Sequence, residues 1–396
     1  MRVLLSTIPA HGHFHPMVPL ARALAEAGHE TAFATARDYC ERVEQSGFRT
    51  FPVGLETPRR GEELDRTLRE LETVPPLQRQ RFGFRRIFAE LLAPATIGDL
   101  VRVVRQWEPE LLIHDPTELA GPLAATIAGI PYANHSFGHL FDGAVVRNGA
   151  EAIAPLWNEW GKQAPEAAGL YQYLYLDICP PSLQFPHISE ITVAQKLQPV
   201  PFDAAPGEVL PSWFDSLSDA PVVYVTLGTV FNRLDALFRQ ILEGLRDQHL
   251  NVIVTVGSTV DPAALGPQPD NVHIERYIPQ TLLFPRCDVV VSHGGSGTTL
   301  AALGHGLPLL TIPQGADQFR NAERCATAGV GRSLMPTDVS PDAIAFHVSA
   351  LLADAAYRRN AARVQREIQT MPSPADVVGR LEELVATSVR AQLPRP

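Results

Sequence analysis

The stretch VVVSHGGSGTTLAAL, from Val289 to Leu303, decides the fold. Apolar, β-branched residues typical of a buried strand lead into a turn with three glycines, and a helical pattern then begins near Thr298. A strand that passes through glycines into a helix is a βα unit of a doubly wound parallel sheet. Such a turn lets the backbone approach a ligand closely, while the free amides and the positive end of the helix attract phosphate. We therefore predict a diphosphate site, to which His293 can add a ring donor and Ser296 and Thr298 hydroxyl donors.

This turn differs from other glycine-rich phosphate sites. Its spacing is not the GxGxxG of dinucleotide-binding proteins, and it lacks the Lys of an ATP-binding P-loop, so neither NAD nor ATP is indicated. A purely structural βα turn remains an alternative reading of the same glycines. After one more strand comes IPQGADQFRNA, from Ile312 to Ala322, which puts Asp317 and Gln318 at a strand end on the same rim. A carboxylate beside an amide suits a ligand rich in hydroxyl groups, because together they accept and donate hydrogen bonds.

Outward from this motif, the chain shows two series of strands separated by the Pro-rich stretch Pro199 to Pro221. The first series has strands at 3–8, 31–35, 111–114 and 132–135, with helices at 17–27 and 118–128. The second series has strands at 222–227, 252–256, 272–274, 289–292 and 309–312. Helices at 341–353, 356–369 and 376–391 follow it. A chain of 396 residues exceeds the roughly 250 to 300 residues of one hydrophobic core. We predict an α/β protein with two Rossmann-like doubly wound domains facing across a cleft: an N-terminal domain at 1–200, a linker at 201–220, a C-terminal domain at 221–375, and a last helix at 376–396 able to cross back.

Composition narrows the classes of partner. The sequence has 33 Lys and Arg against 43 Asp and Glu, a formal net charge of -10 at pH 7, without a basic run suited to a phosphate backbone. We therefore expect no nucleic acid partner. The opening residues Met1 to Ile8 are typical of a first strand, and no apolar stretch approaches the roughly 18 residues of a membrane span, so we expect a cytoplasmic protein. The four Cys show no spacing typical of a zinc site.

A second motif, IPAHGHFHPMVPLARAL, follows the first strand from Ile8 to Leu24. Its alternating His residues allow a metal interpretation, since an HxH pair at a first strand end also occurs in metal-dependent barrel hydrolases. Such barrels have eight βα units and draw further ligands from later strands, whereas this chain divides into two series. We therefore predict no metal site here.

Taken together, the motifs resemble those of a known family. SHGGSGTT and PQGADQFRNA, with RYIPQ at Arg276 to Gln280 and TLGT at Thr226 to Thr229, look like the donor-binding half of the inverting GT-B glycosyltransferases that decorate antibiotics and related natural products, macrolides and enediynes among them. The resemblance covers nearly the whole chain. It implies a GT-B fold and transfer of a sugar from a nucleotide diphosphate to a hydroxyl of a small, largely apolar acceptor. The donor-binding residues that it implies are Gly228, Thr229, Tyr277, Ile278, His293, Gly295, Ser296, Gly297, Thr298, Asp317 and Gln318.

Individual roles follow from the same resemblance. Tyr277 stacks on the base, the backbone of Ile278 reads the base edge, and Thr229 reaches a phosphate. The second His of HGH, His13, is the general base, because a neutral imidazole titrates close to the working pH. Asp115, in LLIHDPTEL, is the carboxylate that orients His13, although a helix N-cap is its structural alternative. His11 and His15 are expected to be supports.

One departure from the family concerns the donor. Relatives that use uridine donors carry a Glu that grips the ribose hydroxyls, and this chain has Ala301 there. Loss of that carboxylate predicts a TDP-sugar in preference to a UDP-sugar. Since no DxD-like pair is present to hold a divalent ion, we also expect metal-independent transfer with no cofactor beyond the nucleotide sugar.

The acceptor site is expected in two stretches that look irregular, Glu56 to Pro94 and Phe137 to Ala168, because they are rich in aromatic residues. The candidate acceptor-binding residues are Phe82, Phe84, Phe88, Phe137, Phe141 and Trp157. Two other functions stay open: a sugar-nucleotide epimerase of the same fold, and a nucleotide-binding auxiliary protein for a partner transferase. The sequence predicts a monomer or homodimer but neither the acceptor nor the sugar.

Overall fold

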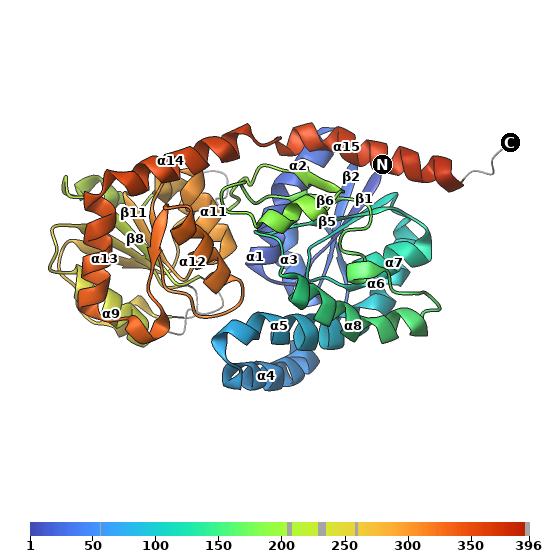
Figure 1. Ribbon diagram of the computed structural model, residues 1–396, viewed down its shortest axis with the longest axis horizontal. Helices are drawn as coiled ribbons and strands as arrows, with labels where there is room; N and C mark the ends of the chain where they lie inside the picture. Colours follow the sequence, from blue (N-terminus) through green and yellow to red (C-terminus); the bar gives the residue numbers. More distant parts are fainter. Residues whose placement is uncertain (56, 204–207, 229–234, 258–259, 393–396) are drawn as a thin grey trace. The chain divides into compact units, whose positions relative to one another are not determined.

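The computed structural model describes residues 1–55, 57–203, 208–228, 235–257 and 260–392 (Figure 1). The chain forms two compact units, each built on its own sheet. Unit 1 comprises residues 1–179, 185–198 and the chain from 371 onward, and unit 2 comprises residues 180–184 and 199–370. The predicted fold class, two doubly wound parallel-sheet α/β domains, is confirmed.

Within the described residues, unit 1 contains a seven-stranded parallel sheet in the order β3-β2-β1-β4-β5-β6-β7. Its strands are β1 (Arg2–Ser6), β2 (Glu30–Thr35), β3 (Arg49–Pro52), β4 (Leu111–His114), β5 (Tyr132–His135), β6 (Tyr175–Asp177) and β7 (Ala194–Lys196). Helices cover both faces of the sheet, which is why a central strand such as β1 is a continuous apolar run: Val3, Leu4 and Leu5 are fully buried.

The helices of unit 1 include one that comes from the far end of the chain. They are α1 (His11–Phe14), η1 (His15–Met17), α2 (Val18–Glu26), α3 (Arg37–Gln45), α4 (Thr57–Thr73), η2 (Pro76–Gln78), α5 (Arg79–Gly83), the π-helix η3 (Phe84–Leu92), α6 (Ala93–Trp107), α7 (Ala120–Ala128), α8 (Gly143–Glu159), η4 (Glu166–Gly169), η5 (Pro186–Glu190) and α15 (Pro374–Gln392). The last of them, α15, packs along α2 near the N-terminus (Figure 1).

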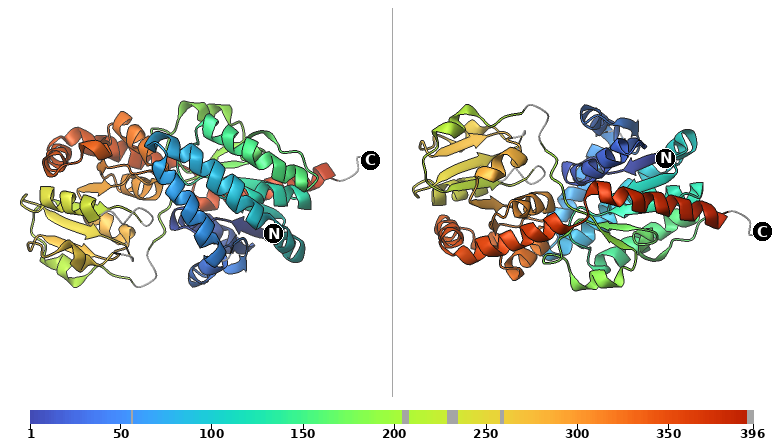
Figure 2. Two further views of the ribbon diagram at one scale, coloured as in Figure 1. Left: turned by 90° about the horizontal axis from the view of Figure 1, so that it is seen from below. Right: turned by 90° about the horizontal axis from the view of Figure 1, so that it is seen from above.

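The two stretches expected to be irregular are largely helical. Residues 57–92 form α4, η2, α5 and η3, and residues 143–159 form α8, which lies beside η3 (Figure 2). Asp142 caps α8 by accepting a hydrogen bond from the amide of Ala144 at 2.8 Å. Gly149 on α8 leaves room for the ring of Phe84, because a Cβ there would come within 2.3 Å of that ring. The expectation of loops was wrong because the aromatic residues recur at helical spacing and pack into the core.

Unit 2 contains a six-stranded parallel sheet among its described residues, in the order β10-β9-β8-β11-β12-β13. Its strands are β8 (Val222–Thr226), β9 (Asn251–Thr255), β10 (Val272–Glu275), β11 (Val289–Ser292), β12 (Leu309–Thr311) and β13 (Gly331–Ser333). Its helices are η6 (Ser212–Ser216), α9 (Asp235–Leu245), η7 (Pro262–Leu265), α10 (Gln280–Leu283), η8 (Phe284–Arg286), α11 (Ser296–Gly304), α12 (Gln318–Thr327), η9 (Pro336–Asp338), α13 (Pro341–Ala353) and α14 (Ala355–Thr370).

Each sheet reverses its direction of winding at its centre. In unit 1 the reversal lies between β1 and β4, and in unit 2 between β8 and β11. In open parallel sheets, ligands bind beyond the carboxyl ends of the strands at such a switch point. The two His-containing motifs follow β1 and β11, so each unit has its functional motif at its own switch point.

A glycine holds α9 close to α13 in unit 2. A Cβ on Gly244 would lie 2.4 Å from the backbone oxygen of Pro341. We expect Gly244→Ala to lower the free energy of unfolding by about 1–3 kcal/mol, because backbone must move to admit the methyl group. The exposed helical Gly379 has no atom within 4 Å of its Cβ position, and Gly379→Ala should instead stabilise by about 0.5–1 kcal/mol. Urea unfolding of both variants checks this; a Gly244→Ala protein as stable as wild type would contradict it.

Candidate active site

One candidate site lies at the switch point of unit 1. Strands β1 and β4 are paired in parallel with Ser6 opposite His114, so the residues after the two strands emerge at the same edge. His13 is on the short helix α1 after β1, and Asp115 directly follows β4. Their side chains meet although they are 102 residues apart: His13 Nδ1 lies 3.1 Å from Asp115 Oδ1.

Asp115 is buried, with 1% of its surface exposed, and is held from several sides. Oδ2 accepts hydrogen bonds from the hydroxyl of Thr7 and the amide of Ile8, both at 3.0 Å. Oδ1 accepts from the amide of Thr117 at 2.8 Å and from its hydroxyl at 2.6 Å. Burial by itself raises the pKa of Asp115, but the adjacent His13 and these hydrogen bonds outweigh it and hold that pKa well below the ordinary range.

A charged Asp115 sets the orientation of the His13 ring. A carboxylate can only accept, so the Nδ1 nitrogen carries the proton in this contact and Nε2 keeps its lone pair. The hydroxyl oxygen of Thr117 also lies 3.1 Å from Nδ1. The side chain of His13 is 17% exposed, so a ligand can reach it, whereas its partner is out of contact with solvent. This is the arrangement expected of a general base with an orienting carboxylate.

Glu118 lies three residues after Asp115 in the sequence. From the sequence it was expected only to begin a helix, but the structure shows a buried carboxyl group. It is 4% exposed, and its two oxygens accept the amides of Ala120 and Gly121 at 3.1 and 2.9 Å. Burial, and then the charge of Asp115, raise the pKa of Glu118 to about 7.

Two of the predicted acceptor-binding aromatics lie beside His13. The ring of Phe137 meets that of His13 edge-on, with 4.7 Å between the ring centroids. The ring centroid of Phe88 lies 6.3 Å from that of His13. Both are partly exposed, as is Phe82. The remaining candidates, Phe84, Phe141 and Trp157, are 1%, 8% and 1% exposed and belong to the hydrophobic core. Their burial leaves almost no surface for an acceptor, because they fill the space between α8, η3 and the sheet.

The other two His of the trio face away from Asp115. The rings of His11 and His15 stack with 5.1 Å between centroids, and His11 Nδ1 lies 2.7 Å from the hydroxyl of Tyr39 on α3. Burial is the main cause that lowers the pKa of His11 to about 4 and that of His15 to about 3, so both are neutral at pH 7. The contact between His11 and Tyr39 ties α1 to α3.

A separate candidate site lies at the switch point of unit 2, where β8 and β11 pair with Thr226 opposite Ser292. The ring of His293 sits between two glycines: a Cβ on Gly228 would come 2.6 Å from it, and one on Gly295 would come 2.5 Å from Nε2. Burial lowers the pKa of His293 to about 4, so the ring is neutral at pH 7 and offers a single N–H.

A hydrogen-bonded cluster joins the glycine turn to the motif after β12. The hydroxyl of Ser296 donates to Asp317 Oδ2 at 2.6 Å. Asn321, on α12, donates to the carbonyl of Gly294 and to the same Oδ2, both at 2.9 Å. Gln318 is 2% exposed, and its Oε1 accepts the amides of Gln314 and Gly315 at 2.7 and 3.0 Å, so this oxygen fixes the turn that presents Asp317.

The remaining donor-side predictions lie along one rim. Tyr277 is 57% exposed, and its hydroxyl donates to the carbonyl of Asp203, whereas the side chain of Ile278 is buried. The side-chain amide nitrogen Nε2 of Gln280, at the start of α10, lies 3.3 Å from the hydroxyl oxygen of Thr298 on α11. This contact connects the rim to the glycine turn. Gly297, exposed in the first turn of α11, has no atom within 4 Å of its Cβ position. Thr229 lies outside the described residues.

Sequence reasoning did not identify Thr117 or Asn321. Both hold a predicted carboxylate, Asp115 and Asp317 respectively, and both lie within quoted motifs, so proximity to the carboxylate was their one signal. Within the described ranges, no group of three or more His, Cys, Asp or Glu side chains has the arrangement of a metal site.

Two family models match consecutive parts of this chain. The model described as erythromycin biosynthesis protein CIII-like, N-terminal domain, matches residues 22–228, and that of the C-terminal domain matches residues 239–384. The chain belongs to the erythromycin biosynthesis protein CIII-like family. L-demethylnoviosyl transferase of Streptomyces niveus is 35% identical to it over 391 residues, which are 95% of this chain and 96% of that protein. This CIII-like chain is therefore a natural-product glycosyltransferase that takes its sugar from a nucleotide donor.

Solved structures agree with this assignment. The glycosyltransferase VinC in complex with dTDP is 28% identical, with a TM-score of 0.81, and the match covers 98% of this chain and 100% of VinC. The spinosyn rhamnosyltransferase SpnG complexed with spinosyn aglycone is 26% identical, with a TM-score of 0.77, over 96% of this chain and 100% of SpnG. The predicted GT-B fold of the CIII-like chain is confirmed. None of its helices within the described residues is long and apolar enough to cross a bilayer.

Buried imidazoles predict sensitivity to acid. Burial lowers the pKa of His114, His135 and His293 to about 4, whereas a His in an unfolded chain titrates near 6.5. Between these values the unfolded chain binds more protons than the folded protein, so the free energy of unfolding falls as the pH drops. Glu118, whose pKa is raised, makes the free energy of unfolding rise as the pH drops, but it is a single group set against three imidazoles.

We therefore expect a lower urea midpoint at about pH 4.5 than at about pH 6.5. His135→Gln, which removes one buried imidazole, should reduce this difference, and the exposed-helix variant Gly379→Ala should leave it unchanged. Equal midpoints for the wild-type protein at the two pH values would contradict the argument.

Proposed function

We propose that this protein is an inverting glycosyltransferase in which His13 is the general base, Asp115 orients it, and the donor is a TDP-sugar. The observation that carries the proposal is the contact between His13 and the buried, multiply anchored Asp115. An imidazole that is fixed by a carboxylate on one nitrogen and accessible on the other suits proton abstraction from a hydroxyl. An acceptor base of this kind also favours transfer over epimerisation of the donor.

In the proposed reaction, His13 Nε2 takes the proton of the acceptor hydroxyl as its oxygen attacks the anomeric carbon of the sugar. The new oxygen–carbon bond forms on the face opposite the leaving group, so the anomeric configuration inverts. The bond from that carbon to the diphosphate oxygen breaks, and its electron pair leaves with the nucleotide diphosphate. Asp115 stabilises the imidazolium formed in this single displacement.

The donor would be held by unit 2. The amino end of α11, the ring N–H of His293 and the hydroxyl of Thr298 are suited to the diphosphate, and their combined positive potential would stabilise its charge as it leaves, without a metal ion. Asp317 is suited to sugar hydroxyls, because its bonds from Ser296 and Asn321 both go to Oδ2 and fix the carboxylate. The exposed ring of Tyr277 offers a flat surface for the base.

A first experiment removes the base. We expect His13→Ala to lower kcat/KM by about 10²–10⁴ fold, because the acceptor hydroxyl loses its proton acceptor. TDP binding, measured by isothermal titration calorimetry, should be unchanged because the donor residues lie in unit 2. His11→Gln, on the same short helix, is the matched control and should keep most of the activity. A His13→Ala enzyme with near-normal turnover would refute the assignment of the base.

A second experiment concerns the nucleotide. Ala301 on α11 carries only a methyl group, so it offers no acceptor for a ribose 2′-hydroxyl. We expect kcat/KM for a TDP-sugar to exceed that for the UDP-sugar with the same sugar by at least about tenfold. Ala301→Glu should reduce this ratio by supplying the missing acceptor. A clear preference of the wild-type enzyme for UDP would rule out the proposed donor. The complexes of VinC with dTDP and of SpnG with thymidine diphosphate support the proposal by analogy.

A further inference from the structure

Asp203, a residue of unit 2, holds the donor rim of that unit from two sides. Its carboxylate accepts hydrogen bonds from the amides of Gln280 and Thr281, and from the hydroxyl of Thr281 at 2.7 Å. Its backbone carbonyl accepts the hydroxyl of Tyr277. All four donors belong to residues 277–281, the segment that leads from β10 into α10, 74 to 78 residues after Asp203. One residue therefore fixes both ends of this segment.

The start of α10 needs a hydrogen-bond acceptor from elsewhere in the chain. The first amides of a helix have no partner among its own carbonyls. The residue at the N-cap position, Pro279, has no side-chain acceptor, and the carboxylate of Asp203 takes its place. Capping accounts for these carboxylate contacts. It does not account for the bond from Tyr277 to the carbonyl of the same residue.

The bond from Tyr277 restrains a ring at the surface. The side chain is 57% exposed, so contacts with its neighbours do little to select one rotamer. Its hydroxyl donates to the carbonyl of Asp203, and the carboxylate of Asp203 is itself tied to Thr281. A ring that is already fixed loses less conformational entropy when a planar group stacks on it.

The same segment is connected to the start of α11. The side-chain amide of Gln280 lies 3.3 Å from the hydroxyl of Thr298 on α11 and 3.3 Å from that of the buried Tyr224. The side chain of Ile278, in the middle of the segment, is 2% exposed. The segment that carries the exposed ring is therefore fastened to the core and to the helix start that is proposed to bind the diphosphate.

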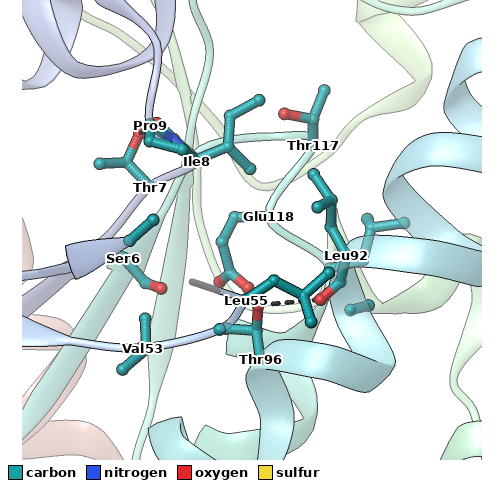
Figure 3. Close-up of a pocket in the computed structure, with 14 residues that line it drawn as sticks. Ser6, Thr7, Ile8, Pro9, Val53, Leu55, Leu92, Thr96, Thr117 and Glu118 are labelled. Carbon is teal, nitrogen blue, oxygen red and sulfur yellow. Dashed lines mark hydrogen bonds between the residues drawn. The ribbon is translucent and has the colours of Figure 1, made fainter. Parts of the chain in front are cut away.

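A carboxylate has a similar task in unit 1. Thr7, Ile8 and Thr117 line a small pocket near the end of β1 (Figure 3). All three donate hydrogen bonds to Asp115, which contacts the proposed base. Asp203 receives the same kinds of bond, from two amides and a hydroxyl, and its partners are also distant in the sequence. In each unit, a fixed carboxylate thus supports an aromatic ring of the proposed site.

We infer that Asp203 is a positioning residue for the donor: it holds the segment 277–281 so that the ring of Tyr277 is ready to stack on the base of the nucleotide. The inference rests on the proposed function, since it assumes that the base stacks on Tyr277. It extends the donor site to a residue outside the sequence motifs, which acts through Tyr277 and not on the diphosphate.

Nucleotide binding to the full chain tests this without any transfer reaction. The probes are TDP, which has a base and a diphosphate, and inorganic pyrophosphate, which has no base and is measured by competition with TDP. We expect Asp203→Ala to weaken TDP binding about tenfold, because the ring and its segment must then be ordered on binding. Pyrophosphate affinity should not change, because His293 and the start of α11 keep their places.

Further variants locate the effect. Asp203→Asn keeps an acceptor oxygen and should recover most of the TDP affinity. Tyr277→Phe removes only the hydroxyl and should weaken TDP binding about two- to tenfold. Adding Asp203→Ala to Tyr277→Ala should weaken TDP binding much less than Asp203→Ala does alone, because the two residues act in series. Asp219→Ala, at an exposed carboxylate in the same Pro-rich stretch, is the matched control and should bind both probes like the wild-type protein.

The inference is overturned if either Asp203→Ala or Tyr277→Phe binds TDP as tightly as the wild-type protein. It is also overturned if Asp203→Ala weakens pyrophosphate as much as TDP, or if its effect adds fully to that of Tyr277→Ala. Because Tyr277 is exposed, Tyr277→Phe decides the question even where Asp203→Ala fails to fold. Wild-type TDP affinity in Tyr277→Ala would instead refute the proposed stacking, and the inference with it. None of these results depends on His13 as the base.

Discussion

The pairing of β1 with β4 is the constraint on which the contact between His13 and Asp115 depends. These strands are neighbours only because the sheet reverses its winding between them, and their register places Ser6 beside His114. The short helix after one strand and the turn after the other then share an edge, which allows His13 to contact Asp115. The hydrogen bonds from Thr7, Ile8 and Thr117 keep the carboxylate in place when the ring is neutral. The geometry of the His13–Asp115 contact is thereby set by backbone pairing.

Unit 2 uses the same topology for different chemistry. Its switch point between β8 and β11 presents a neutral His293 between two glycines, together with a helix start, and so offers hydrogen-bond donors, whereas we propose a proton acceptor in unit 1. Asn321 ties the glycine turn to Asp317, so the phosphate and sugar ends of a nucleotide sugar would meet one connected cluster. In the proposed reaction, two copies of one architecture would thus divide the tasks of activating a nucleophile and holding a leaving group.

Sequence analysis succeeded where a feature is local. Strands β4, β5 and β11 have the predicted bounds, because each is an apolar run that ends at a polar turn. It missed β3, β6, β7 and β13, which are three or four residues long and carry no periodicity of their own. The role of Thr117 depends on a contact with His13 across 104 residues of sequence. Likewise, the sequence does not distinguish an aromatic residue that lines a pocket from one that packs in the core. For this reason the predicted acceptor residues include the core residues Phe84 and Trp157.

The helix α15 has a consequence for how the chain is made. It belongs to unit 1 and packs on α2, but the whole of unit 2 precedes it in the sequence. During synthesis, the early strands of unit 1 can assemble while the apolar side of α2 that α15 will cover is still open to solvent. That surface stays exposed until the last residues, among them the buried Val377 and Leu381, leave the ribosome. A nascent chain stalled within unit 2 is therefore a species prone to association, even though most of its first unit is already present.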